Sequence, residues 1–210
     1  MSLVSVFLLC APSLAFRRSA SRVLARETSP DRAARIWDAT KKRRAELRKS
    51  RPRHSFGVNR LLRFFEWDGA LFSAAKQEGI PAATAGRLVE EINWGVFGPA
   101  LGLSFSISRL RSRHLGTRVH WLVDLMFGVL FTSPFQRTKL PSTRDVAFDV
   151  TVCPLARYFQ DRGVPELTHY AACSLDHRMA ADWGVRFERT QTIAEGKALC
   201  DFRFRIPGQE

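Results

Sequence analysis

The stretch DVAFDVTVCP, residues 145–154, is where the hydrophobic pattern of the chain changes from helical to alternating. Every second residue over 146–152 is apolar, which is typical of a half-buried strand. The same alternation returns at 185–188 and at 200–206, which predicts two further strands. Glu195-Gly196 supplies a turn between these two strands, so we expect them to pair as a hairpin.

The chain before this stretch has the spacing of amphipathic helices. Ser29 and Pro30 suit the start of one helix, as the N-cap and the first-turn residue. Because Gly95 and Pro99 interrupt a later apolar region, we expect one helix to end near Gly95 and a separate apolar segment to follow. The expected helices are 30–49, 58–77, 81–95 and 117–131, with an apolar segment at 97–110, a loop at 134–141, and short helices at 154–162, 165–171 and 173–183.

These elements predict an α+β fold. An N-terminal helical portion would pack on a small antiparallel β-sheet, and short helices would carry a cluster of cysteines. Arg51-Pro52-Arg53 breaks the helical pattern and is the predicted domain boundary. The predicted parts are a targeting leader at 1–29, a basic helix or linker at 30–52, and an α+β domain at 53–210.

The net charge of +13 is concentrated at the start of the chain. Residues 1–63 contain 16 Lys and Arg against 4 Asp and Glu, whereas residues 64–210 contain 17 against 16. A nucleic-acid-binding domain would carry its basic residues on a folded face, so this segregation argues against a nucleic acid as partner. The basic run from Lys41 to Arg44 is interpreted as a solvated helix face. We expect a small-molecule substrate instead.

The first 29 residues have the composition of a targeting leader. The apolar run at 2–11 is too short to cross a bilayer, and small residues at Ser13 and Ala15 suit cleavage after Ala15. Residues 16–26 hold four arginines and no acidic residue, which is typical of a transit peptide. A signal followed by a transit segment is similar to bipartite plastid leaders and predicts a plastid location, with mitochondrion or secretion as alternatives. No transmembrane segment is expected in the mature chain.

Three cysteines near the end of the chain are the candidates for chemistry. Cys153 stands at the expected start of a helix, where free N–H groups and the helix dipole would favour a thiolate. Cys173, Asp176 and His177 fall one helical turn apart, so one helix face could present a thiol with its base, or two ligands of a metal. Cys200 lies on the inward face of its strand.

Each of these residues also has a plainer interpretation. Free cysteines are often simply buried, and His177 could lie on a solvated face. The sequence requires no cofactor, and the spacing of the cysteines matches no standard zinc module. Zinc or iron held by Cys153, Cys173 and Cys200 is the metal site that the sequence allows.

Several ordered motifs between residues 145 and 206 carry a family resemblance. They are Cys153-Pro154, Gly163 with Pro165-Glu166-Leu167, Cys173-x-x-Asp176, Glu188-Arg189-Thr190, Glu195-Gly196 and Cys200-Asp201-Phe202-Arg203-Phe204. Together they resemble the L-2-amino-thiazoline-4-carboxylic acid hydrolase family, with a fainter helical similarity in the preceding residues. The resemblance implies hydrolytic opening of a cyclic amidine-like ring to a carbamoyl-cysteine product.

The resemblance also implies site residues. Carried over by position, they are Cys153, Cys173, Asp176, Cys200 and Asp201. His177 is not part of the family pattern and enters only as a neighbouring base.

The roles of these residues form a hypothesis. A thiolate, or a water activated by Asp176 or His177, would attack the ring carbon between nitrogen and sulfur. Asp201 would hold the amidinium, and Arg189 or Arg203 would bind the substrate carboxylate through two hydrogen bonds. Cys200 would line the substrate pocket. The alternative is a non-catalytic module that binds a small molecule or a metal in a cysteine-lined pocket.

Overall fold

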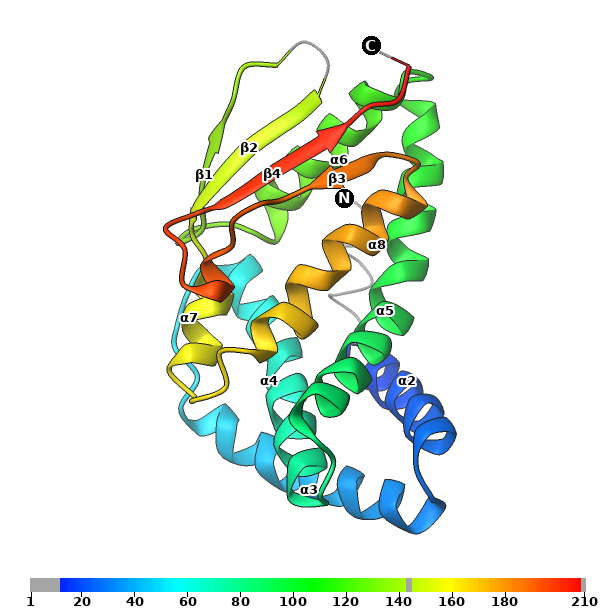
Figure 1. The fold of residues 1–210 in the computed structure, drawn as a ribbon, viewed down its shortest axis with the longest axis vertical. Coiled ribbons are helices and arrows are strands. Elements are labelled where there is room, and N and C mark those ends of the chain that lie inside the picture. Colours follow the sequence, from blue (N-terminus) through cyan, green and yellow to red (C-terminus); the bar gives the residue numbers. More distant parts are fainter. Residues whose placement is uncertain (1–11, 143–144, 209–210) are drawn as a thin grey trace.

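The computed structural model describes residues 12–142 and 145–208 and confirms the α+β fold (Figure 1). Helices form one end of the molecule and a four-stranded antiparallel sheet forms the other, with α5 running between the two. Helices α2 to α8 are, in order, Pro12–Glu27, Pro30–Lys49, Phe56–Gln77, Ala82–Ile107, Leu115–Val129, Pro154–Gln160 and Ser174–Asp182. Strands β1 to β4 are Gln136–Lys139, Asp145–Val152, Arg186–Glu188 and Cys200–Arg205.

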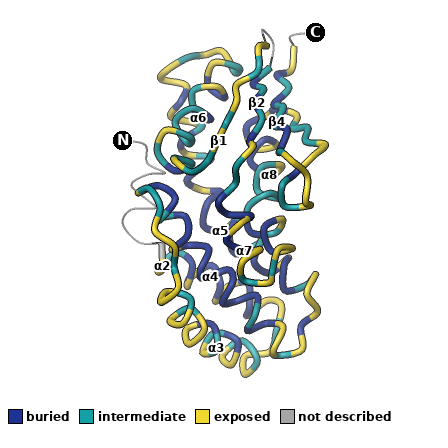
Figure 2. Tube along the Cα trace, turned by 90° about the vertical axis from the view of Figure 1, so that its left-hand side faces the viewer, coloured by how far each residue is buried: buried dark blue, intermediate teal, exposed yellow. Residues whose placement is uncertain are grey.

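Helices α3 and α4 begin and end close to where the sequence predicts. The Ser29 side chain accepts a hydrogen bond from the backbone N–H of Arg32, as an N-cap does, and Pro30 occupies the first turn. Figure 2 shows α3 mostly exposed, whereas α4 is buried along most of its length and α5 alternates between buried and partly exposed residues. Helix α3 therefore covers the outside of the helical end, and α4 and α5 form its centre.

Helix α5 corrects the prediction that a helix ends near Gly95. It continues from Ala82 to Ile107 with Pro99 inside it, so the separate segment predicted at 97–110 is wrong. Gly95 serves close packing rather than termination, because a Cβ there would lie 2.4 Å from Ser19 Oγ of α2. The Ser19 hydroxyl in turn donates to the Ile92 carbonyl at 2.8 Å. Glycine thus allows α2 to cross α5 at this point.

Helix α2 contributes to the buried core of the helical end. The Phe16 ring is fully buried and stacks on Trp67 of α4, with 5.5 Å between ring centroids. This helix lies within the predicted leader, and the predicted cleavage point after Ala15 falls inside it. The apolar run at 2–11 lies outside the described residues. The leader, the 30–52 linker and the boundary at Arg51 stay predictions.

The sheet has the strand order β1-β2-β4-β3, and every neighbouring pair is antiparallel. The hairpin predicted from the last two strands is confirmed by the pairing of β3 with β4. On the inner face Phe148 lies opposite Phe202, and Val150 lies opposite Cys200. The outer face carries charged pairs, such as Asp145 opposite Arg205.

Strand β1 was not predicted, because its residues lie in the expected loop at 134–141. Its sequence, Gln-Arg-Thr-Lys, is polar and mostly exposed, as is common in an edge strand. Arg137 places its guanidinium 4.3 Å from the Phe127 ring centroid and pairs with Asp124 at 2.7 Å. An edge strand with so little apolar alternation gives no clear period-two signal.

Two clusters of buried apolar residues meet along α5. The first joins α2 to α5 with α7, and the second joins the inner face of the sheet to α6 and α8. Leu101 of α5 and Phe135 pack against both clusters. Within the described ranges, none of the helices has both the length and the apolar character needed to cross a membrane.

Candidate functional site

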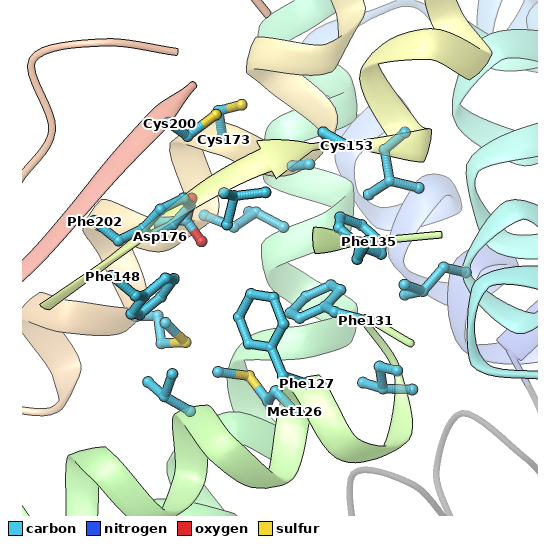
Figure 3. A pocket seen from close by; sticks show the side chains of 18 of the residues that line it. Met126, Phe127, Phe131, Phe135, Phe148, Cys153, Cys173, Asp176, Cys200 and Phe202 are labelled. Atoms are coloured by element: carbon cyan, nitrogen blue, oxygen red, sulfur yellow. The ribbon is translucent and has the colours of Figure 1, made fainter. Parts of the chain in front are cut away.

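A cavity of about 160 Å³ lies between the inner face of the sheet, α6 and α8 (Figure 3). Its polar lining comes from Asp176 and Arg189, and all three predicted cysteines reach its wall. The remaining wall is apolar, with phenyl rings from α6, from the segment after it and from the two central strands. The fold therefore gathers Cys153, Cys173, Cys200, Asp176 and Arg189 around one hollow.

A π-helical turn delivers two of these groups. It spans His169–Cys173 and leads directly into α8, where Asp176 follows within the first turn. Such wide turns occur often at functional sites. The Asn93 side chain supports the turn from α5 by donating to the Ala171 carbonyl at 2.9 Å. The chain then returns through β3, which brings Arg189 back against Cys173 and Asp176.

Asp176 and Arg189 form the charged end of the cavity. Arg189 Nη1 donates to Asp176 Oδ2 at 2.7 Å, and Nη2 donates to the Cys173 carbonyl at 3.0 Å. The Asp176 carboxylate points into the space between the rings in Figure 3. Burial raises the pKa of Asp176 to about 6, although the positive charge of Arg189 acts in the opposite direction. This carboxyl can therefore change protonation state close to neutral pH.

The thiols of Cys153 and Cys173 are held in their neutral form. Burial raises the pKa of Cys153 to about 11, and it outweighs the lowering effect of the N–H groups of Ala156 and Leu155 at the start of α7. Burial and the nearby Asp176 carboxylate raise the pKa of Cys173 to about 12. The position of Cys153 at a helix start is as predicted, but the thiolate expected there is wrong.

Three predicted site residues lie away from the cavity wall. His177 is exposed and packs edge-on against Phe187, with 4.8 Å between ring centroids. Asp201 is a buried residue of strand β4 and accepts hydrogen bonds from Thr190 and Gln191. Burial raises the pKa of Asp201, but these hydrogen bonds outweigh it and leave the pKa below its ordinary value. Arg203 donates to backbone carbonyls and to Asp149, which places it in the outer face of the sheet.

The metal site allowed by the sequence is wrong. Across residues 12–142 and 145–208, no group of three His, Cys, Asp or Glu side chains is placed to hold a metal ion. The form that binds a metal is the thiolate, and burial disfavours it at Cys153 and Cys173. Zinc or iron held by Cys153, Cys173 and Cys200 is therefore not supported.

Two features of the site were not predicted. Phe127, Phe131 and Phe135 close one side of the cavity, and the sequence places them in a helix end and a loop with no signal of a shared hollow. The Thr192 hydroxyl lies 3.9 Å from Cys173 Sγ and 3.5 Å from Cys200 Sγ, so it links two thiols from distant segments. Only the high phenylalanine content of the chain could have indicated the aromatic wall.

A model of the L-2-amino-thiazoline-4-carboxylic acid hydrolase family matches residues 129–204. The predicted family is confirmed over these residues. This hydrolase-family region contains Asp176, Arg189 and the three cysteines of the cavity. It excludes α2 to α5, although Leu61 and Phe65 of α4 and Phe97 and Leu101 of α5 line the cavity, and it also excludes Phe127 of the aromatic wall. No curated protein matches the chain.

Proposed function

We propose that the chain is a hydrolase that opens a small cyclic amidine-like ring. The match to the hydrolase family over the residues that form the cavity supports this assignment. The ring would lie in the cavity beside Asp176, with a water molecule as the attacking group. The five-residue cluster of thiols, carboxylate and guanidinium gives this region a chemical character that a purely structural core would not need.

The single observation that carries the proposal is that the Asp176 carboxylate, whose pKa is about 6, faces the cavity. A group whose pKa lies near the working pH can both take up and release a proton during a reaction. The ion pair with Arg189 holds this carboxylate in one orientation. Asp176 is thus the candidate general base.

The proposed reaction consumes one water molecule. Asp176 takes a proton from water as the water oxygen bonds to the ring carbon between nitrogen and sulfur, and the C=N electron pair moves onto nitrogen. A bond from that carbon to a ring heteroatom then breaks, its electron pair stays on the departing atom, and that atom takes the proton held by Asp176. The former water oxygen becomes a carbonyl oxygen as its remaining proton passes to the nitrogen. The product is the open chain, which contains the elements of one water molecule, and Asp176 returns to its ionised form.

Water is a better nucleophile candidate than the thiol of Cys153 or Cys173. A thiol attacks as its thiolate, and pKa values of about 11 and about 12 leave little thiolate at neutral pH. The cysteines would then act as compact, polarisable wall residues.

The test is ring opening by the full-length protein, followed by mass spectrometry with 2-amino-thiazoline-4-carboxylate and related cyclic amidines. Asp176→Asn should lower turnover by roughly 100-fold or more, which is the usual contribution of a general base. Asp182→Asn, at an exposed position of the same helix, is the matched control and should retain turnover. Binding without ring opening by the wild-type protein would support the alternative binding module instead.

A further inference from the structure

The wall of the cavity away from Asp176 is almost entirely hydrocarbon. In the part of the chain that the structure describes, eight phenylalanines line this one space, together with aliphatic residues and two methionines. Phe127 and Phe131 come from α6 and its end, and Phe148 and Phe202 come from paired strands. The phenyl rings labelled in Figure 3 surround the space into which Asp176 points. A ligand that fills the cavity must therefore place most of its surface against aromatic rings.

The cavity offers no free positive charge to an anionic ligand group. Arg189 is the one cation among the described lining residues, and its side chain is only 5% exposed. Both of its terminal nitrogens already donate, one to Asp176 and one to the Cys173 carbonyl. Arg137 is close by, but it pairs with Asp124 and lies against the Phe127 and Phe148 rings rather than in the wall of the cavity. A substrate carboxylate would be buried there without a partner, which is strongly unfavourable.

The volume limits the size of the whole ligand. A cavity of roughly 150 Å³ lined by aliphatic and phenyl side chains can hold benzene. The cavity here measures about 160 Å³. It therefore suits a compact ligand of about one ring in total, with a polar edge and a small hydrocarbon substituent.

From this asymmetry we propose that the substrate is a cyclic amidine with a small apolar substituent, such as a methyl group, in place of a carboxylate. The amidine N–H groups donate to Asp176, and the substituent packs among Phe127, Phe131 and Phe148. The inference rests on the proposed function only for the amidine head. The apolar body follows from the wall of the cavity alone.

The experiment compares two probes on the full-length wild-type protein: 2-amino-4-methyl-4,5-dihydrothiazole and the matching 4-carboxylate. Calorimetry or ligand-detected NMR measures the Kd of each, and mass spectrometry follows ring opening. We expect the methyl compound to bind at least tenfold more tightly. Equal or tighter binding of the carboxylate, or binding of neither probe, would overturn the inference.

A charge placed in the wall provides a second test. Phe131→Lys should reverse the preference in favour of the carboxylate, because it adds the missing cation beside the cavity. Phe56→Lys is the matched control, since Phe56 is 65% exposed and lies away from the cavity wall, and it should keep the wild-type preference. The wild-type comparison still decides if Phe131→Lys does not fold.

The two proposals fail separately. If the methyl compound binds more tightly but neither ring opens, the hydrolase proposal fails and the ligand class stands. If both rings open and the carboxylate has the higher kcat/KM, the hydrolase proposal stands and the ligand class is wrong.

Discussion

Asp176 and Arg189 form a 2.7 Å ion pair at the polar end of an otherwise apolar cavity. The two residues are 13 positions apart and lie on either side of β3, so the return of the chain along the sheet brings them together. Arg189 also holds the Cys173 carbonyl at the end of the π-helical turn. One arginine thus positions both the candidate base and the turn that precedes it.

The pH dependence of turnover should follow Asp176. A general base acts in its ionised form, so kcat/KM should rise with pH through the Asp176 pKa of about 6 and then level off. Arg189→Met removes the charge that lowers this pKa, so the midpoint should move up by about one unit or more. Arg186→Met, at an exposed position of β3, should leave the midpoint unchanged. If the midpoint of the pH profile were the same in Arg189→Met as in the wild-type protein, the assignment of Asp176 as the base would be contradicted.

The two buried thiols should react slowly with alkylating reagents. Because the pKa values of Cys153 and Cys173 are raised to about 11 and about 12, iodoacetamide at neutral pH should label both far more slowly in the folded protein than in urea. Mass spectrometry of tryptic peptides measures each rate.

Cys173→Ser should also retain turnover within about tenfold if water is the nucleophile. Complete loss of turnover in that variant would restore thiol catalysis.

Arg51 should matter for stability even though it lies at the predicted domain boundary. Its guanidinium makes a two-pronged ion pair with Glu66, whose side chain is fully buried in α4. Arg51→Met leaves that carboxylate without its partner and should cost about 3–5 kcal/mol in the free energy of unfolding. Arg157→Met removes an exposed ion pair with Asp161 and should cost no more than about 1 kcal/mol. Urea unfolding of the two variants measures the difference.

Phe16 should contribute to the stability of the full-length chain. Its ring is fully buried between Trp67 and Phe64, so Phe16→Ala should cost about 3–5 kcal/mol. The exposed Phe56 is the matched control, and Phe56→Ala should change stability by less than about 0.5 kcal/mol. Similar unfolding curves for both variants would show that α2 does not support the domain.

The targeting prediction for 1–29 has its own test, which is the amino-terminal sequence of the protein isolated from the cell.

Asp68 should make the protein less stable as pH rises. Burial raises the pKa of Asp68 well above its ordinary value, although a hydrogen bond from Asn93 acts in the opposite direction. The neutral carboxyl is therefore favoured in the folded state, and this contribution is present at acid pH and lost as pH rises through the folded pKa. Among the described residues, the buried Asp68 Oδ1 and Asn93 Oδ1 have no hydrogen-bond partner, so Asp68 Oδ1 has no donor that would stabilise a negative charge.

The test of Asp68 is the slope of stability against pH. Asp68→Asn removes the titrating group, so the free energy of unfolding should fall less between about pH 4 and about pH 8 than in the wild-type protein. The comparison with wild type cancels Asp176, which acts in the same direction. Asp182→Asn should keep the wild-type slope, and an equal slope in Asp68→Asn would mean that Asp68 is ionised throughout.

The strands and several helices could be predicted because their signals are local. Alternation over 146–152 and 200–206 reports which side chains share a face, and the pairing of β2 with β4 follows that pattern. The N-cap at Ser29 depends only on the next few residues. The continuity of α5 through Gly95 could not be predicted, because it depends on Ser19 of α2, which is distant in the sequence.

The candidate site divides in the same way. Residue order alone was enough to indicate the family, the inward direction of Cys200 and the helix start at Cys153, since each depends on neighbouring residues. Only the folded arrangement decided that Asp176 and Arg189 face the cavity while His177 and Asp201 do not. It also decided that the thiols of Cys153 and Cys173 stay protonated, because the pKa of a buried group depends on the loss of water around it. That loss is produced by side chains from the whole chain, and no local pattern records it.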